Sequence, residues 1–457
     1  MRPSIQSARL LESMAIALAR EVLPKVQSDS TRFVVRAACR LALRQAMGLA
    51  ATSTPQNPTS SVVSNPTCSL LQWPQPDAEA LISALATDAR MYAEGIDKFA
   101  QKLDELTAPN IDACVVPDGG TLSRYLRERF QDPTAEALNV SPVVGGYSKQ
   151  TVLFDYLSSN GVTTSLVMRR DLPRNNVGTT VVDEFMLLKA VFQTGFPVAE
   201  PLWLEETSSV IPGAFLVSRR VAGRATGNPL GIVGTLEFDP ARMLAKLLAR
   251  LHAIDVKALG VPGISDVSFG EDVLQQRIDY WEREYSSNVE SSSSALEIGL
   301  AWLKANVHLG LGDAVLVHGE IGFHNILFDG SVLTALLDWE LAHLGSAADD
   351  LAYVRPFVES FMAFDKFLMY YAQEGRSVPP RSALVYYQVF ANVRNAIIGV
   401  KSLRGFHDGL HDDLPLVSIV ADTAPVYVGT LRRILSDIIR EHGFRWEQGL
   451  RRSEKST

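Results

Sequence analysis

The chain has 457 residues, 47% hydrophobic and 21% charged, with a formal net charge of −8 and a pI of about 5.6. This composition is typical of a soluble globular protein of about two to four domains, and it argues against a nucleic-acid-binding role for the whole chain. There is no run of about 18 apolar residues, which excludes a transmembrane helix. Charged residues interrupt the N-terminal apolar run, so no secretory signal is expected. Three separated cysteines indicate neither disulfides nor a zinc site, and we expect a cytoplasmic protein.

Residues 1–107 are predicted to form an all-α accessory domain. Apolar residues recur every four positions over 10–22, and helical periodicity resumes over 77–106. Between these helices, residues 50–69 are rich in Ser, Thr, Pro and Asn and predict a flexible loop. Because the region lacks clustered polar residues, we expect it to dock a protein partner or form a homodimer rather than catalyse a reaction.

Proline and glycine residues over 108–120 predict a linker. Beyond it, residues 121–222 predict a small lobe in which short strands form an antiparallel sheet, with a helix at 181–193 between the early and late strands. Residues 223–445 are predicted to form a larger helical lobe, followed by a tail at 446–457. This order predicts an α+β, two-lobed protein-kinase-like fold preceded by the all-α domain.

The positions of individual elements follow from the local patterns. Beyond the helix at 181–193, apolar spacing at i, i+3 and i+4 predicts helices at 122–130, 242–254, 270–285, 294–307, 357–373, 382–402 and 425–442. Short apolar runs predict strands at 165–170, 202–205, 214–219, 314–317, 326–328 and 333–337. Residues 143–154 read as a strand, a glycine turn and a second strand.

A polar motif lies within the larger lobe. His318-Gly319-Glu320 is followed by Asn325 five residues after the Glu and by Asp338 thirteen residues after the Asn. Kinases use an acid, an amide and a second acid in this order. Glu320 is predicted to orient the substrate hydroxyl, and Asn325 and Asp338 are predicted to bind Mg²⁺, which prefers such oxygen ligands. Either ligand alone is a common turn or cap residue, so it is the spacing that favours phosphoryl transfer.

Gly145, Gly146 and Ser148 are candidates for a turn over the nucleotide phosphates. Glycine allows the backbone to approach a phosphate closely, and backbone N–H groups and a hydroxyl can donate to its oxygens. Any hairpin can carry two glycines, so this signal is weak without the other motifs.

Arg169 and Arg170 end the next predicted strand, where a cation is expected to contact the α- and β-phosphates. Glu184, on the following helix, is expected to hold that cation by an ion pair, and both arginines are candidates. Arginine in place of the usual lysine offers a bidentate fork rather than a point charge. The alternative is an Arg–Glu pair on the protein surface.

Glu320 departs from the Asp that such enzymes nearly always carry. Its extra methylene moves the carboxylate by about one C–C bond, and misplacement on the order of 1 Å can cost about a hundredfold in rate. The neighbouring backbone could compensate, the pocket could serve a more distant hydroxyl, or activity could have been lost. We expect structural roles for His318 and His324, and we expect Asp350 to anchor the catalytic loop or cap the next helix.

These motifs together resemble the aminoglycoside phosphotransferase/choline kinase-like superfamily. The family pattern HGD-x4-N appears at His318–Asn325, LDWE at Leu337–Glu340, GG-x-S-x-x-T at 145–151 and VLRR at Val167–Arg170. The resemblance covers about residues 120–445 and is closest to the branch found as kinase domains fused to, or partnered with, acyl-CoA dehydrogenases.

The resemblance implies ATP and Mg²⁺ as cofactors and a small-molecule hydroxyl as acceptor, with hydroxyacyl-CoA thioesters or hydroxy acids favoured over aminoglycosides. The alternatives are a nucleotide-binding pseudokinase that serves as a regulatory partner, and an aminoglycoside-type antibiotic kinase. The following cations of the helical lobe would either meet an anionic acceptor or form a solvated surface: Arg394, Lys401, Arg404, His407 and His411.

Overall fold

The computed structural model describes residues 116–143, 149–171, 177–228, 231–232, 239–289, 293–407 and 414–442. They belong to two compact units, one formed by Cys114–Arg277 with Asn306–Ala391 and the other by Ile278–Ala305 with the chain from Asn392 onward. The predicted all-α domain and its docking role lie outside the described residues, and the predicted domain boundaries stay predictions.

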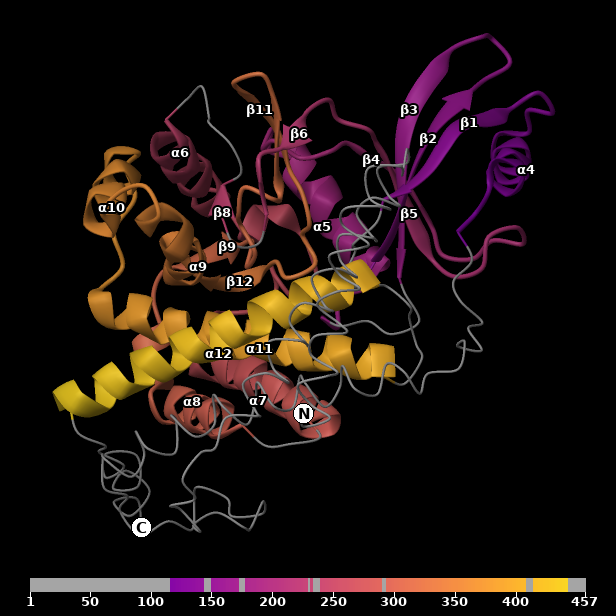
Figure 1. The fold of residues 1–457 in the computed structure, drawn as a ribbon. Coiled ribbons are helices and arrows are strands. Elements are labelled where there is room, and N and C mark those ends of the chain that lie inside the picture. Colours follow the sequence, from indigo (N-terminus) through magenta and orange to yellow (C-terminus); the bar gives the residue numbers. More distant parts are fainter. Residues whose placement is uncertain are drawn as a thin grey trace, which may run out of the picture. The chain divides into compact units, whose positions relative to one another are not determined.

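In the first unit, a five-stranded antiparallel sheet forms the small lobe, in the order β1-β2-β3-β5-β4 (Figure 1). Its strands are β1 (Glu136–Val143), β2 (Lys149–Leu157), β3 (Thr163–Asp171), β4 (Pro201–Glu205) and β5 (Phe215–Arg219). The antiparallel lobe and its strands β2 to β5 are therefore confirmed, whereas β1 lies almost entirely before residue 143, where the first strand was predicted to begin. The glycine turn predicted between β1 and β2 lies outside the described residues.

Two helices accompany this sheet. Helix α4 (Gly119–Phe130) packs on β1 (Figure 1), and its first turn is capped by Asp118, which accepts from the Thr121 N–H. Helix α5 (Val181–Gln193) has the predicted bounds and begins at a capping box in which Thr180 and Asp183 satisfy each other's backbone N–H groups. Because α5 follows β3 directly, it brings Glu184 next to the end of that strand.

The pleat of β3 separates its two arginines. Successive side chains on a strand point to opposite faces of the sheet. Leu166, Met168 and Arg170 are all buried on the face that packs against α4 residues such as Leu122. Arg169 therefore points to the opposite face, toward α5.

The remainder of the first unit supports the polar motif. Its helices are α6 (Pro240–His252), the 3-10 helices η5 (Lys257–Leu259) and η6 (Val307–Gly310), α9 (Ala347–Glu359) and α10 (Phe364–Gln373). Its strands are β6 (Arg224–Ala225), β7 (Gly227–Asn228), β8 (Gly231–Ile232), β9 (Ala314–Val317), β10 (Ile326–Asp329), β11 (Val332–Leu336) and β12 (His343–Ser346). Strand β9 pairs with β12, and β10 pairs with β11 and β6, so two short sheets hold both ends of the motif.

The single helix predicted over residues 357–373 is wrong. Residues 357–373 do not form a single helix, because α9 begins at Ala347 and ends at Glu359, and α10 begins at Phe364. Ser346 caps α9 by accepting from the Ala348 N–H. The apolar residues of the connecting segment continue the helical spacing, which hid the break.

In the second unit, α8 (Ser294–Ala305) packs on α12 (Leu414–His442). A Cβ built on Gly299 of α8 would lie 2.8 Å from the Val393 side chain, so this glycine permits a close helix contact. Helices α7 (Glu271–Asn288) and α11 (Arg381–His407) each belong partly to both units. No helix in the described part of the chain is long and apolar enough to cross a membrane.

Candidate active site

Arg169 connects the end of β3 to α5 and to the segment after β11. Its Nη2 lies 2.9 Å from Asp338 Oδ1 and 3.3 Å from Glu184 Oε1. The ion pair expected between the strand cation and the helix Glu is thus present, and it extends to Asp338. Three predicted site residues that are far apart in the sequence form one cluster.

Arg170, the other candidate cation, has a different environment. It is 3% exposed, and its Nε donates to Gln150 Oε1 over 2.9 Å and its guanidinium to the Pro212 carbonyl. These contacts fasten β3 to β2 and to the loop before β5. Among the described site residues, Glu184 and Asp338 are contacted by Arg169.

Burial and charge oppose each other in this cluster. Burial lowers the pKa of Arg169, but the carboxylates of Glu184, Asp338 and Glu340 outweigh it, so its pKa is raised and the guanidinium stays charged. Burial raises the pKa of Glu184, and Arg169 opposes this shift. Arg169 Nε and Glu184 Oε2 are buried and have no hydrogen-bond partner among the described residues. The cluster therefore keeps one donor and one acceptor atom buried without a partner in the described part of the chain.

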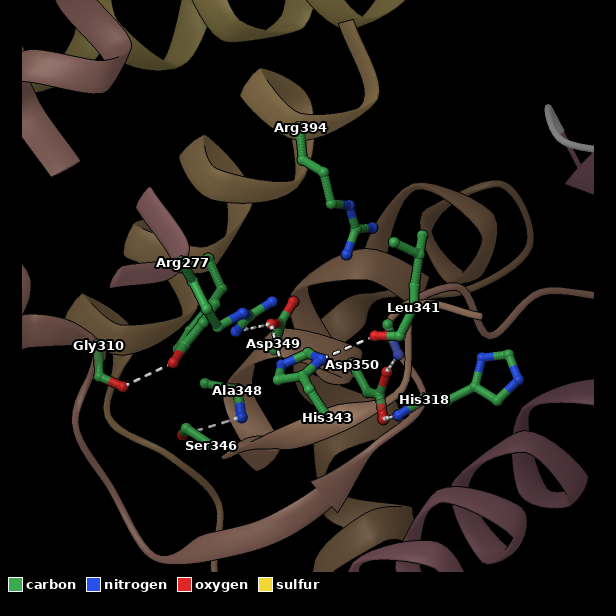
Figure 2. A network of polar contacts seen from close by, with 12 residues as sticks. Arg277, Gly310, His318, Leu341, His343, Ser346, Ala348, Asp349, Asp350 and Arg394 are labelled. Carbon is green, nitrogen blue, oxygen red and sulfur yellow. Dashed lines mark hydrogen bonds and ion pairs between the residues drawn. The ribbon is translucent and has the colours of Figure 1, made fainter. Parts of the chain in front are cut away.

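The turn before Glu320 is bound by Asp350, in the first turn of α9. Its carboxylate accepts the backbone N–H groups of His318 (2.9 Å) and Gly319 (2.8 Å), and it lies 3.2 Å from His252 Nε2. The side chains of Asp350 and the neighbouring Asp349 have separate partners, as Figure 2 shows. The expectation that Asp350 anchors the loop carrying Glu320 is confirmed.

The backbone conformation and the surroundings of position 319 require a glycine. Its φ is +84°, and a Cβ at this position would lie 2.7 Å from the Leu341 carbonyl oxygen. Few side chains adopt this backbone conformation, and none would fit against that carbonyl. The turn thereby brings the residues before Glu320 into contact with the segment after Asp338.

His318 is fully buried and hydrogen-bonded on both ring nitrogens. Nε2 lies 2.9 Å from the Leu337 carbonyl, and Nδ1 accepts the Glu320 N–H at 3.2 Å. The carbonyl can only accept, so this network assigns the neutral tautomer with its proton on Nε2. The ring also meets Trp339 edge-on, with 5.0 Å between centroids. The structural role expected for His318 is confirmed.

Asn325 is tied to the same turn. Its Nδ2 donates to the Glu320 carbonyl over 3.0 Å, which directs the amide oxygen away from that contact. Its own carbonyl accepts the Leu337 N–H at 2.7 Å. The start of β10 is thereby joined to the residue immediately before Asp338, so the two predicted metal ligands are carried by adjoining backbone.

Asp338 has a left-handed backbone, with φ of +64°. A residue other than glycine in this region costs about 1–3 kcal/mol, and such strain persists where surrounding contacts impose it, often at functional sites. Here it turns the chain after Leu337 so that the Asp338 carboxylate meets Arg169.

The donor set fits Mg²⁺ better than a metal held entirely by protein. Among the described residues, no group of three or more His, Cys, Asp or Glu side chains could hold a metal ion. Mg²⁺ usually takes only one or two protein ligands and completes its shell with phosphate oxygens and water. Asn325 and Asp338 supply such a pair. Gly145, Gly146 and Ser148 lie outside the described residues, and their phosphate-binding role stays a prediction.

Two polar contacts beside the site were not predicted from the sequence. Lys149, the first residue of β2, is buried and donates to Asp171 Oδ1 (2.6 Å) and to the Thr179 carbonyl, holding the segment that leads into α5. On the other side, Asp349 lies 3.2 Å from His343 Nε2 and 3.3 Å from an Arg277 nitrogen (Figure 2). A cross-strand Lys149–Asp171 pairing could have indicated the first contact, but only once the register of the sheet was known.

The cations proposed for an anionic acceptor are only partly described. Arg394 and Lys401 are 1% and 4% exposed, so a solvated surface is wrong for these two. Lys401 Nζ lies 2.5 Å from Glu284 Oε2 in the same unit. The side chains of His407 and His411 lie outside the described residues. A role for this group toward the acceptor stays a prediction.

The sequence of the chain is similar to part of several acyl-CoA dehydrogenase family members. It is 32% identical over 247 residues to acyl-CoA dehydrogenase family member 11 of Gallus gallus, and 28% identical over 253 residues to the protein of the same description from Homo sapiens. Each match covers 52% of this chain and 31% of the relative, so the chain spans about a third of the length of these relatives. The predicted resemblance to domains associated with acyl-CoA dehydrogenases is confirmed.

The fold comparison agrees. A crystal structure of a candidate aminoglycoside phosphotransferase from Ralstonia eutropha JMP134 has a TM-score of 0.51 and 22% identity, over 70% of this chain and 98% of that one. This similarity shows a shared α+β fold with an antiparallel β lobe and a helical lobe. Residues 139–383, more than half of the chain, match the model of the phosphotransferase enzyme family. The chain belongs to this family of phosphotransferases.

Proposed function

We propose that this protein transfers the γ-phosphoryl group of ATP, with Mg²⁺, to a hydroxyl group on a small molecule. The observation that carries the proposal is the contact of Arg169 with both Glu184 and Asp338. Phosphoryl transfer needs in-line positioning and neutralisation of phosphate charge more than covalent help from the protein. A partly buried cation held between a helix carboxylate and a candidate metal ligand supplies the neutralisation of charge.

Each residue has a proposed role. Arg169 contacts the nucleotide phosphates, and Glu184 holds it in place. Asn325 and Asp338 hold Mg²⁺, which when bound draws charge from the phosphate oxygens. Glu320 accepts a hydrogen bond from the acceptor hydroxyl and orients it, taking the proton late in the reaction. Gly145, Gly146 and Ser148 are proposed to cover the phosphates.

For the acceptor, we propose a hydroxyacyl-CoA thioester or a related hydroxy acid. The similarity to acyl-CoA dehydrogenase family members supports this choice over an aminoglycoside, since it places the matching region in proteins described by acyl-CoA chemistry.

One observation favours a second function. Glu320 stands where related enzymes carry Asp, and its side chain is 27% exposed. A displaced carboxylate would suit a protein that binds nucleotide without turnover and acts as a regulatory partner, with residues 1–107 as its docking region.

Titration calorimetry with Mg-ATP, followed by ³¹P NMR turnover against a panel of hydroxyacyl-CoA thioesters, hydroxy acids and aminoglycosides, separates these functions. If the protein is a kinase, the γ-phosphoryl group is transferred to at least one of these acceptors, and the Glu320→Gln variant loses this transfer. Glu359→Gln is the matched control, because Glu359 is exposed and pairs with Arg355 within α9. Tight nucleotide binding without transfer to any acceptor would replace the kinase by the regulatory partner.

A further inference from the structure

His324, one residue before Asn325, occupies a confined position. A Cβ built on Gly322 would lie 2.6 Å from His324 Cε1 and 2.8 Å from Nδ1, so the imidazole fills the space beside this glycine. Phe357 of α9 packs near the ring, with 6.3 Å between centroids. The side chain is 14% exposed. These contacts hold the ring in one place.

The ring nitrogens of His324 are the unusual feature. Both are buried, and neither has a hydrogen-bond partner among the described residues. A buried polar atom without a partner is destabilising, because it gives up its hydrogen bonds to water, and each such atom in a native protein calls for an explanation. His318, in the same turn, has both nitrogens bonded. The unused bonding capacity of His324 points to a partner that is engaged only in the working state.

Glu320 offers a carboxylate within reach of His324. Its Oε1 lies 4.0 Å from His324 Nε2, beyond hydrogen-bond distance but close enough for a side-chain rotation to close the gap. An imidazole carries at least one N–H in either charge state, so His324 can donate to this carboxylate.

We propose that His324 is a positioning residue for Glu320, donating a hydrogen bond from Nε2 to the Glu320 carboxylate and directing it toward the acceptor hydroxyl. The inference rests on the proposed function of Glu320. A donor at His324 also explains how position 320 can carry Glu in place of Asp. The longer side chain has one more rotatable bond, and a donor fixed by Gly322 and Phe357 restrains it.

The hydrogen bond from His324 to Glu320 does not change which bonds form and break in the reaction. The acceptor oxygen forms a bond to the γ-phosphorus, the bond from that phosphorus to the bridging oxygen of ADP breaks, and the hydroxyl proton passes to the Glu320 carboxylate and then to water. His324 keeps its own proton throughout. Its contribution is geometric, so it should affect kcat through Glu320 rather than the binding of nucleotide.

A double-mutant cycle tests the coupling. His324→Phe should lower kcat about tenfold or more while the KM for Mg-ATP changes by less than about twofold. His324→Gln keeps an N–H near the Nε2 position and should stay within about threefold of the parent. In the Glu320→Asp background the shorter carboxylate does not reach, so His324→Phe should change kcat by less than about twofold. Equal losses from His324→Phe in both backgrounds would mean a merely structural histidine.

A second measurement does not depend on turnover. In histidine-labelled full-length protein with Mg²⁺ and a non-hydrolysable ATP analogue, ¹⁵N NMR should show His324 as the Nε2–H tautomer. Its Nε2–H signal should shift in Glu320→Gln but not in Glu359→Gln. An Nδ1–H tautomer, or a signal indifferent to Glu320→Gln, overturns the inference. If the parent protein transfers no phosphate but the NMR result holds, the proposed function fails while the His324–Glu320 contact stands.

Discussion

Asp350 binds the backbone of His318 from the first turn of α9, with 2.9 Å between Oδ2 and the His318 nitrogen. Burial raises the pKa of Asp350, but hydrogen bonding and electrostatic attraction from His252, with support from His318, outweigh burial and lower it. The carboxylate is therefore ionised at neutral pH. The turn before Glu320 thus depends on one buried negative charge, which Asp350 supplies from α9, a helix that comes later in the sequence.

Replacing Asp350 by Asn should destabilise the protein and abolish most activity. An amide cannot accept all the hydrogen bonds that the carboxylate accepts, and its NH₂ group would face the N–H donors of His318 and Gly319. We expect a loss of about 3 kcal/mol in the free energy of unfolding, measured by urea denaturation. Asp365→Asn, at an exposed position on α10, is the control and should change stability by less than about 0.5 kcal/mol. An equal effect of the two substitutions would show that the anchor is unimportant.

Gly319→Ala and Gly375→Ala separate backbone strain from steric conflict. Both glycines have φ of +84°, but only Gly319 has a carbonyl oxygen, that of Leu341, within 2.7 Å of a built Cβ; Gly375 has nothing within 4 Å. Gly375→Ala should lower the free energy of unfolding by about 1 kcal/mol, through backbone conformation alone, and leave turnover unchanged. Gly319→Ala should cost more and lower kcat at least about tenfold, because the turn before Glu320 must shift. Thermal unfolding and turnover assays on both variants check this, and matching kcat values would remove the steric argument.

Much of the architecture was predictable because apolar spacing and capping residues are local signals. The bounds of α5 follow from Thr180, Asp183 and the apolar residues after them. The break between α9 and α10 was missed because Phe361 and Met362 continue the helical spacing where the chain leaves the helix. Local patterns describe which residues can lie on one face, but not where a chain turns to satisfy tertiary contacts.

The candidate site, like the fold, was only partly predictable from the sequence. The order of Glu320, Asn325 and Asp338 indicated phosphoryl transfer without a structure. The choice between Arg169 and Arg170 could not be made, because neighbouring residues on a strand point to opposite faces and nothing local states which face carries the site. The separate partners of Asp349 and Asp350 likewise depend on how α9 packs, which sequence spacing does not contain.

Arg169→Lys should weaken nucleotide binding while keeping the fold. A lysine keeps the charge but loses the guanidinium, whose Nη2 lies near both Glu184 and Asp338 and whose other nitrogens are further donors. We expect the KM for Mg-ATP to rise about tenfold, a change of about 1.4 kcal/mol, with little change in the melting temperature. Arg170→Lys is the matched control: Arg170 bonds Gln150 on the opposite face, so its loss should lower the melting temperature and leave the KM within about twofold. The reverse pattern would assign the nucleotide cation to Arg170.

The buried imidazole of His324 should make stability depend on pH in a defined direction. Burial lowers its pKa from 6.5 to about 4 in the folded protein, so between these values the unfolded chain binds a proton that the folded protein does not. The stabilising contribution is therefore complete above pH 6.5 and is lost progressively as the pH falls toward 4. At pH 5 this residue alone should reduce the free energy of unfolding by about 2 kcal/mol relative to pH 7. His324→Gln has no titrating group there, so urea denaturation should show its pH 5 to pH 7 difference smaller by about that amount. An unchanged difference would mean that burial does not lower the pKa of His324 in the folded protein.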